Sequence, residues 1–362
     1  MKIDVVLGLS YGDEGKGKIC HSLLENGKYT HVMRFNGGHN AGHTIYHNGK
    51  KLITHIIPSG VFYGIKSIIG PGCVVDVEKF FREIDYLEDN GIKTEGLVYI
   101  ANNAHLILPE HLEEDGKDVV IGTTRTGNGP CYRDKYARKG ARVKDMPILQ
   151  PYLIDIYSEF YGSNNRNVKV LAEGAQAFHL DIDWGEYPFV TSSHCGIGSV
   201  LLNGFNHKQI RDVYGIIKAY DTYVGTKDFQ PEGEIFERIQ EEGKEFGATT
   251  GRKRKCNWLN WNNIQQAIKM NGVNKLVVNK VDILEKVNEF KILRDGKLLG
   301  FENKYEFEQY IRKEAYKLGA EVYFSYSPLY CNFAVKEKDD YKSLRSEEHT
   351  SELQSQSTIS YA

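Results

Sequence analysis

A glycine-rich stretch at residues 8–18 constrains this chain more than any other feature; it runs Gly-Leu-Ser-Tyr-Gly-Asp-Glu-Gly-Lys-Gly-Lys. It follows an apolar run at residues 3–7 and precedes another at 19–24, a pattern that predicts a buried strand, a loop and a helix. In α/β proteins such a loop presents backbone N–H groups to phosphate at the start of a helix. The sequence therefore predicts a phosphate-binding loop. For the motif taken alone, an ordinary glycine-rich turn is the alternative.

The spacing of this loop differs from that of an ordinary P-loop. Residues 12–18 satisfy the pattern G-x-x-x-x-G-K, but Ile19 stands where a P-loop has the Ser or Thr that holds Mg²⁺. A carboxylate inside the loop, from Asp13 or Glu14, could bind the metal or act as a base. We therefore expect a phosphate loop with an acidic functional group.

The composition predicts a globular protein of ordinary surface charge. Of its 362 residues, 41% are hydrophobic, which is enough for one large core or two modest ones. The formal net charge is −2 and neither a basic tract nor a long apolar span is present, so we expect no nucleic-acid or membrane partner. Six scattered cysteines and no signal peptide predict a cytoplasmic protein with cysteines in its core.

Apolar, β-rich runs recur along the chain with helix-like stretches between them, at residues 3–7, 31–35, 97–100, 168–171, 213–217, 276–279 and 322–324. This alternation predicts an α/β fold with a mostly parallel central sheet flanked by helices. Asn48-Gly49 and Asp295-Gly296 predict hairpin turns that add strands to this sheet. The clearest helices are expected at 78–89 and 304–318, each followed by a glycine, Gly91 or Gly319, that can adopt a left-handed cap.

One domain is expected over residues 1–342, because no repeat or linker divides the chain. Residues 343–362 are rich in Ser, Glu, Gln and Thr, a composition that predicts disorder. This segment also resembles a translated sequencing adapter, so we expect it to be non-native and assign it no function.

A second glycine-rich loop follows the run at 31–35. It contains the histidines His39 and His43 among three glycines, Gly37, Gly38 and Gly42. Glycine lets the backbone approach a ligand while the imidazoles stay within reach. We expect His43 to serve as an acid or as a hydrogen-bond donor to phosphate. A helical metal pair with His39 is not expected among these glycines.

Several later stretches carry binding chemistry. Hydroxyl groups at 121–132 and five cations at 133–142 suit a monophosphate or carboxylate, although the cations alone would fit a solvated helix face. Gln176 can bind a base or ribose edge, and Thr191 can donate to phosphate. Asp181 and Asp183 are two residues apart, which fits a turn at least as well as a metal site.

Two further motifs suggest the ligands. Residues 245–255 combine hydroxyls with four cations and suit a small dicarboxylate, with a nucleic-acid patch as the weaker alternative. Residues 279–282 match Asn-Lys-x-Asp, in which Asp282 can accept the N1–H and N2–H of guanine. Beside a phosphate loop, this motif favours GTP.

Taken together and in order, from residue 3 to about residue 328, these motifs resemble the adenylosuccinate synthetase family. The matching stretches are 12–18, 37–44, 121–124, 134–138, 172–176, 187–193, 247–252 and 279–282. The resemblance implies a ligase of purine biosynthesis that uses Mg²⁺ and GTP to join L-aspartate to IMP through 6-phosphoryl-IMP. It also implies a cytoplasmic homodimer.

The resemblance implies a role for each matching residue. Asp13, His43 and Lys16 would be catalytic, and Asp13 and the carbonyl of Gly42 would contact Mg²⁺. GTP would be bound by Gly12, Glu14, Gly15, Lys16, Gly17, Lys18, Thr44, Asn279, Lys280, Asp282, Ser325, Ser327 and Pro328. IMP would be bound by Asp13, Asn40, Ala41, Gly42, His43, Thr124, Gln176, Leu180, Thr191, Arg252 and Arg138, the last reaching into the partner subunit's site. Aspartate would be bound by Thr249, Thr250, Arg252, Arg254 and Val224.

The chain also departs from the family pattern. Tyr223 and Thr126 stand where arginine is usual, and the regions after Arg142 and Asp282 are shorter than in bacterial members. This short form resembles archaeal and viral members, some of which use dGMP, but typical dGMP-using relatives lack the loop aspartate, so Asp13 favours IMP. An inactive GTP-binding regulatory protein is the alternative of another class. Such a protein would not need the residues that would bind IMP and aspartate.

Overall fold

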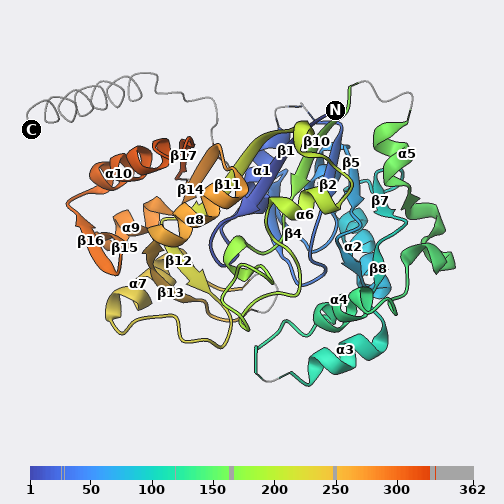
Figure 1. The fold of residues 1–362 in the computed structure, drawn as a ribbon, viewed down its shortest axis with the longest axis horizontal. Helices are drawn as coiled ribbons and strands as arrows, with labels where there is room; N and C mark the ends of the chain where they lie inside the picture. The colour runs from blue at the N-terminus through green and yellow to red at the C-terminus, as the bar shows by residue number, and fades with distance from the viewer. Residues whose placement is uncertain are drawn as a thin grey trace, which may run out of the picture.

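The computed structural model describes residues 1–25, 27, 29–118, 120–162, 167–247, 251–326 and 331. Within these residues, nine parallel strands form the central sheet (Figure 1). Their order is β17 (Glu321–Ser325), β14 (Lys275–Asn279), β11 (Ile210–Lys218), β1 (Lys2–Gly8), β10 (Lys169–Glu173), β2 (His31–Arg34), β5 (Lys66–Ile69), β7 (Val98–Ala101) and β9 (Leu153–Ile154). All seven apolar runs found in the sequence lie in this sheet, which confirms the predicted α/β fold.

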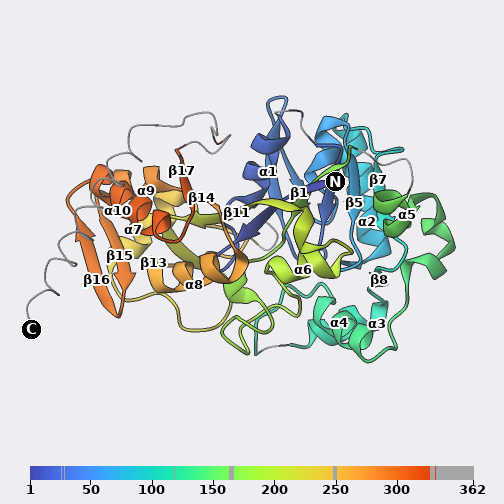
Figure 2. The same ribbon diagram turned by 45° about the horizontal axis from the view of Figure 1, so that its top comes forward.

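Strand β1, next to the middle strand of the sheet, is buried on both faces, as is usual when helices cover a parallel sheet. Ile3, Val5 and Leu7 pack in one core with residues of α6 (Ile197–Leu202) and α8 (Trp261–Asn271). Val6 points to the other face and packs with α1 (Lys16–Leu24). Figure 2 shows α1 on one side of the sheet and α6 and α8 on the other.

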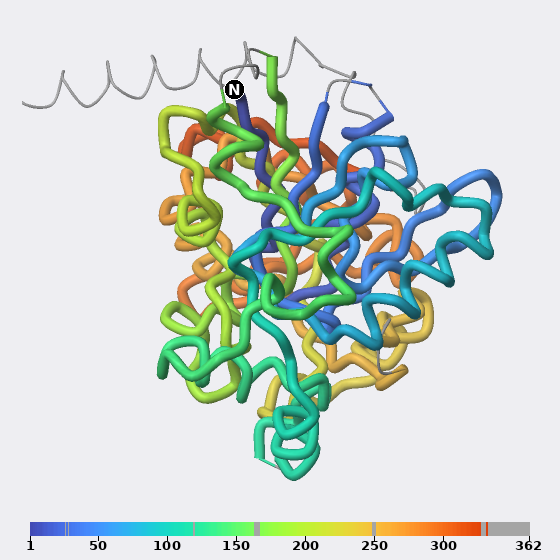
Figure 3. Tube along the Cα trace, turned by 90° about the vertical axis from the view of Figure 1, so that its right-hand side faces the viewer, coloured from blue at the N-terminus to red at the C-terminus, as the bar shows by residue number. Residues whose placement is uncertain are grey.

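The remaining α-helices of the described chain are α2 (Val77–Asp89), α3 (Pro109–Gly116), α4 (Asn128–Tyr136), α5 (Ile156–Tyr161), α7 (Glu234–Gly243), α9 (Val281–Val287) and α10 (Lys304–Tyr316). The helices predicted at 78–89 and 304–318 are α2 and α10. Gly91 (φ 83°) and Gly319 (φ 78°) lie beyond their ends in the left-handed conformation, as expected. Figure 3 shows α3 and α4 projecting together beneath the rest of the fold.

Both predicted hairpins form, with Asn48 (φ 49°) and Asp295 (φ 50°) in their turns. The prediction that they extend the central sheet is wrong. β3 (His43–His47) and β4 (Lys50–Thr54) form a separate sheet, and β15 (Phe290–Arg294) and β16 (Lys297–Phe301) join one with β12 (Tyr220–Tyr223) and β13 (Lys255–Asn260). The reason is that β2 and β14, the strands that precede these hairpins, already have a partner on each side. A short parallel pair, β6 (Val74–Val75) and β8 (His105–Leu106), completes the strands of the described chain.

All six cysteines are free and buried, which confirms the prediction that they lie in the core. Among the described residues, no helix combines the length and the apolar character that a membrane crossing needs. Residues 343–362, for which the sequence predicts disorder, lie outside the described part of the chain.

Candidate active site

The loops after the parallel strands meet at one edge of the central sheet, because the carboxyl ends of parallel strands all point the same way. They surround a pocket of about 1020 Å³. β1, β2, β10, β11, β14 and β17 each contribute at their carboxyl end or in the loop that follows, as do segments near α3, α4 and β13. The pocket therefore collects residues that are distant in the sequence.

Almost every predicted site residue that the structure describes lines this pocket. They are Gly12, Asp13, Glu14, Gly15, Lys16, Gly17, Lys18, Asn40, Ala41, Gly42, His43, Thr44, Thr124, Gln176, Leu180, Thr191, Val224, Arg252, Arg254, Asn279, Lys280, Asp282 and Ser325. Arg138 is the exception; it is exposed just beyond α4 and outside the pocket lining. Thr249, Thr250, Ser327 and Pro328 lie outside the described residues.

The loop at residues 8–18 is held open by Glu14, which turns inward. Its Oε1 accepts hydrogen bonds from the backbone N–H groups of Ser10 (3.2 Å) and Gly12 (2.9 Å). Its Oε2 pairs with Lys16 Nζ at 2.7 Å, and Glu14 is only 2% exposed. The carboxylate of Glu14 therefore shapes the loop instead of facing a ligand.

Asp13 has the opposite orientation and reaches across the pocket. It adopts a left-handed conformation (φ 59°), and its Oδ2 accepts a hydrogen bond from Arg254 Nε at 2.7 Å. Arg254 Nη1 also donates to the fully buried Glu245 at 2.5 Å, and Lys218 Nζ donates to the same carboxylate oxygen at 2.9 Å. Burial alone would raise the pKa of Glu245, but Lys218 and Arg254 lower it to about 2. Glu245 thus anchors the arginine that holds Asp13.

His43 begins β3 and lies between the pocket and a buried carboxylate. Its Nδ1 is 2.5 Å from Glu173 Oε1, and Arg34 Nη2 donates to the same oxygen at 2.9 Å. Burial and the neighbouring Arg34 lower the pKa of His43 to about 4. Burial alone would raise the pKa of Glu173, but Arg34 and His43 hold it well below its usual range. The pocket is therefore backed by an ionised glutamate beside a neutral histidine.

Asn40 and Gln176 come together on the same side as His43. Asn40 Oδ1 accepts from Gln176 Nε2 at 2.9 Å and from the Gly38 backbone N–H at 3.2 Å. Arg252 donates to the carbonyl oxygens of Gly122 and Thr123, which ties the loop after α3 to the segment before β13. These bonds assemble amide, hydroxyl and guanidinium groups into one polar wall.

The opposite wall contains the Asn-Lys-x-Asp motif at the end of β14. Asn279 Nδ2 donates to the carbonyl oxygen of Glu14 at 2.7 Å, joining the motif to the phosphate-type loop. Lys18 Nζ donates to Ser325 Oγ at 2.7 Å, and burial lowers the pKa of Lys18 to about 8. Asp282 lies in the first turn of α9 and lines the pocket. The two motifs thus form a continuous surface.

The two positions at which arginine was expected differ in their surroundings. Tyr223 lines the pocket, packs against Tyr11 and Phe229, and lies 5.0 Å beneath Lys227 Nζ, measured to its ring centroid. Thr126 is buried and hydrogen-bonds Thr124 through its hydroxyl at 2.9 Å. Tyr223 therefore borders the ligand space, whereas Thr126 supports it from behind.

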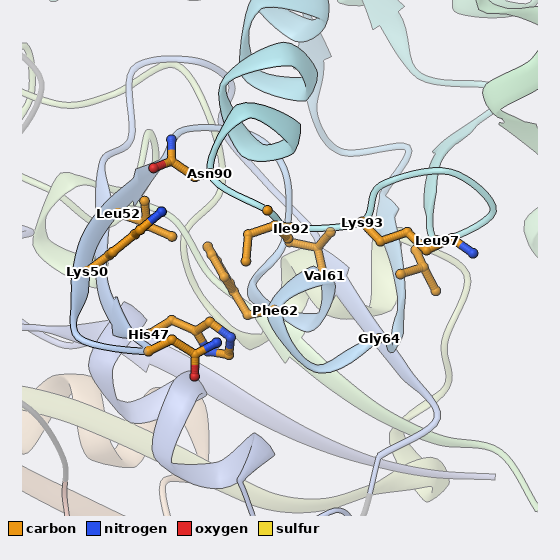
Figure 4. Close-up of a pocket in the computed structure, with 12 residues that line it drawn as sticks. His47, Lys50, Leu52, Val61, Phe62, Gly64, Asn90, Ile92, Lys93 and Leu97 are labelled. Atoms are coloured by element: carbon orange, nitrogen blue, oxygen red, sulfur yellow. The ribbon is translucent and has the colours of Figure 1, made fainter.

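Asp181, Asp183 and His194 lie close enough together to suggest a cation site. However, Asp181 Oδ1 already accepts from the backbone N–H groups of Asp183 (2.9 Å) and Trp184 (3.3 Å). This confirms the turn-stabilising role considered for Asp181. A smaller hollow of about 400 Å³ lies between the β3–β4 hairpin and the end of α2, with Leu52, Phe62 and Ile92 in its lining (Figure 4). No predicted site residue lines it.

Four buried charged residues beside the pocket have no role predicted from the sequence: Arg34, Glu173, Lys218 and Glu245. The first three end buried strands, and a charged side chain in that position is a usable signal, since burial of an unpaired charge is costly. Glu245 gives no such signal. It follows α7, and the acidic residues of that helix are exposed, so the sequence does not mark Glu245 as the buried one.

One buried carboxylate behind the pocket should make stability depend on pH. Burial raises the pKa of Asp221 to about 6, although its Oδ2 accepts a hydrogen bond from the Asn260 N–H. The pKa of Asp221 in the folded protein lies above its unfolded value of about 3.9, so the protonated carboxyl stabilises the folded state. This stabilisation is complete when the pH is below the unfolded pKa, and it is lost as the pH rises through about 6. Asp221→Asn should therefore gain stability relative to the wild type between pH 5 and pH 8. Urea unfolding of both proteins at pH 5 and pH 8 measures this gain. An equal difference in the free energy of unfolding at the two pH values would contradict the prediction.

Comparisons with known proteins agree with these motifs. The sequence model of the family described as adenylosuccinate synthetase matches residues 5–148 and 146–318. The adenylosuccinate synthetase of Phaeosphaeria nodorum is 37% identical over 350 residues, covering 83% of this chain and 82% of its own. That of Vibrio cholerae is 38% identical over 342 residues, covering 80% and 78%.

Solved structures give the same result. The fully ligated adenylosuccinate synthetase of Plasmodium falciparum superimposes with a TM-score of 0.80 and 28% identity, over 91% of this chain and 98% of its own. The succinoaminodeoxyadenylate synthetase of cyanophage S-2L, bound to dGMP and dATP, has a TM-score of 0.74 and 20% identity, over 96% and 99%. At that identity the likeness extends to the fold alone. On the family match and these identities, the chain belongs to the adenylosuccinate synthetase family.

Proposed function

We propose that this protein ligates L-aspartate to IMP at the expense of GTP, giving adenylosuccinate, GDP and phosphate. One observation carries the proposal: a single pocket joins a phosphate-type loop and a guanine-type motif to a second polar wall. The first pair suits GTP, and the second wall, with Asn40, Gln176 and Arg252, suits another anionic nucleotide and a dicarboxylate. A ligase needs both sets of groups within reach of each other.

The residues divide between three ligands. GTP is bound by Gly12, Glu14, Gly15, Lys16, Gly17, Lys18, Thr44, Asn279, Lys280, Asp282 and Ser325. IMP is bound by Asp13, Asn40, Ala41, Gly42, His43, Thr124, Gln176, Leu180, Thr191 and Arg252, together with Arg138 of the partner subunit. Val224, Arg252 and Arg254 bind aspartate. Thr249, Thr250, Ser327 and Pro328 are assigned on the family resemblance alone, because they lie outside the described residues.

The chemistry proceeds in two steps because the oxygen on C6 of IMP is a poor leaving group. Asp13 accepts the N1 proton, which makes O6 nucleophilic, and O6 takes the γ-phosphoryl group as its bond to GDP breaks. Lys16 offsets the charge on that group, and His43 joins it once Nε2 takes up a proton, which the nearby phosphate charge favours. The aspartate amine then bonds to C6, loses a proton and displaces phosphate.

The residues present also fit the Mg²⁺ that the family uses. Mg²⁺ prefers oxygen ligands, and the carboxylate of Asp13 and the backbone of Gly42 both lie in the pocket lining. When bound, the ion would offset negative charge on the GTP phosphates. Asp13 already accepts a hydrogen bond from Arg254, so Arg254 and Mg²⁺ would share its carboxylate.

The nearest alternative acceptor is dGMP, and a side-by-side assay decides between the two. Purified protein is given GTP, Mg²⁺ and aspartate with either IMP or dGMP, and the products are identified by mass spectrometry. We expect adenylosuccinate from IMP and little product from dGMP, since the relatives at 37–38% identity are adenylosuccinate synthetases. Turnover of dGMP alone would reverse the assignment, and no turnover by folded protein would refute the ligase.

A GTP-binding regulatory protein without ligase activity is the alternative of another class. It would use the loop at 8–18 and the 279–282 motif but would leave the second wall without a role. Calorimetry separates the two: we expect IMP to bind as well as GTP. Binding of GTP with neither IMP nor dGMP would favour a regulatory protein.

We also propose that the protein acts in the cytoplasm as a homodimer, with residues 1–342 as the functional unit and no nucleic-acid or membrane partner. The exposed position of Arg138 outside the pocket suits a residue donated to the partner subunit's site. Mixing Arg138→Ala with an inactive pocket variant should then restore activity in hybrid dimers. Mixtures no more active than their components would exclude this arrangement.

A further inference from the structure

Glu173, at the end of β10, is the most completely bonded carboxylate behind the pocket. Its Oε1 accepts from Arg34 Nη2 at 2.9 Å and contacts His43 Nδ1 at 2.5 Å. Its Oε2 accepts from Ser59 N at 3.0 Å and from Ser59 Oγ at 2.6 Å. Glu173 is 0% exposed and does not line the pocket, so it contacts a ligand only through His43.

Ser59 is itself fixed, and it holds the carboxylate in one orientation. It begins a 3-10 helix (Ser59–Tyr63), is 0% exposed, and is followed by Gly60. A Cβ at Gly60 would lie 2.6 Å from Val32 Cγ2 and 2.7 Å from Ser67 Oγ, so the backbone here packs directly on β2 and β5. With two bonds to each oxygen, the carboxylate has one allowed position.

The ionised state of Glu173 determines which nitrogen of His43 carries a proton toward it. A carboxylate beside the Arg34 guanidinium can only accept hydrogen bonds, so the proton of the 2.5 Å contact belongs to Nδ1 of His43. The ring cannot turn without losing this bond. Nε2 is therefore the nitrogen that His43 offers to the pocket. It carries no proton in the neutral ring, so it donates to a phosphoryl oxygen only after taking up a proton, which the phosphate charge of bound GTP favours.

We propose that Glu173 is a positioning residue for His43, fixing the ring plane and presenting Nε2 to the transferring phosphoryl group. A carboxylate that orients an imidazole in this way preserves the geometry that catalysis needs. Losing such a partner costs about 10- to 100-fold where the imidazole binds a metal and about 10⁴-fold in a Ser-His-Asp triad. The other hydrogen bonds of the Glu173 carboxylate hold Arg34 and Ser59 in place. This inference rests on the proposed function, since it gives His43 its role there.

The test combines a spectrum of the wild type with kinetics of three variants. Histidine ¹⁵N NMR of ligand-free wild-type protein should show His43 protonated at Nδ1. Glu173→Gln should lower kcat by about 10- to 10⁴-fold while leaving KM for GTP and IMP within about threefold. Glu173→Asp should recover part of the loss, and Ser59→Ala should give a smaller loss of the same kind.

Glu159 supplies a matched control, because its Oε1 contacts His31 Nε2 at 2.8 Å and Lys66 Nζ at 2.7 Å, also a carboxylate between a histidine and a cation. It lies near the opposite end of β2, away from the pocket. Glu159→Gln should leave kcat unchanged.

An unprotonated Nδ1 in the wild type would overturn the proposal even if Glu173→Gln failed to fold. So would an unchanged kcat in folded Glu173→Gln. An inactive wild type would refute the proposed function instead, while the spectrum would still test the hydrogen bond.

Discussion

Asp13→Asn should lower kcat by about 10²- to 10⁴-fold, because asparagine cannot take the purine N1 proton. Asparagine is preferable to alanine in this test. Asp13 adopts φ 59°, a left-handed conformation that asparagine tolerates well, and the amide oxygen can still accept the Arg254 hydrogen bond. The variant should therefore fold as the wild type does, so the loss isolates the proton acceptor.

Asp295→Asn is the matched control. Asp295 has φ 50°, lies in the turn between β15 and β16, and does not line the pocket. It should retain wild-type kcat and unfold at the same urea concentration. Steady-state rates with IMP varied, together with circular dichroism of both variants, make the comparison. Substantial activity in folded Asp13→Asn would remove Asp13 from the role of base.

Lys16→Met should reduce kcat/KM for GTP by about 10²- to 10³-fold, because the pocket loses a buried cation that offsets phosphate charge. It should also destabilise the protein by about 3–5 kcal/mol. Lys16 is 5% exposed and pairs with Glu14 at 2.7 Å, so its removal leaves a buried carboxylate without its counter-charge. Urea unfolding and rates with GTP varied measure the two effects separately.

A double variant separates catalysis from stability at this pair. Lys16→Met with Glu14→Gln removes the uncompensated carboxylate, so stability should return toward the wild type while activity stays low. Lys117→Met is the surface control, since the Lys117–Glu113 pair at 2.8 Å is largely exposed on both sides and should matter little. Recovery of activity in the double variant would show that Lys16 acts only by supporting Glu14.

The strands were predictable because parallel strands buried on both faces are short apolar runs in the sequence. β5 and β9 were missed for a related reason. β5 has only four residues, one of them a lysine, and β9 has two, so neither stands out from its neighbours. The left-handed conformation of Gly91 and Gly319 was predictable, because the end of a helix requires it locally and glycine adopts it without strain.

The hairpins show where local information ends. Asn48-Gly49 and Asp295-Gly296 specify a turn, and both turns form. Which sheet the strands join depends on whether a central strand still has a free edge, and β2 and β14 have none. That depends on strand order, which no single segment encodes.

The sequence by itself determined that glycine-rich loops follow buried strands, and therefore which residues can approach phosphate. It could not determine how the charged side chains divide their roles. Glu14 turns inward and Asp13 faces Arg254, 241 residues away, while His43 meets Glu173 across 130 residues. The bonds of Glu14 are local, but only the tertiary structure decided the Asp13–Arg254 and His43–Glu173 pairings, because each joins segments that are distant in the sequence. Buried charges that meet in this way must find partners, and those partners set the orientation of the residues that face the ligands.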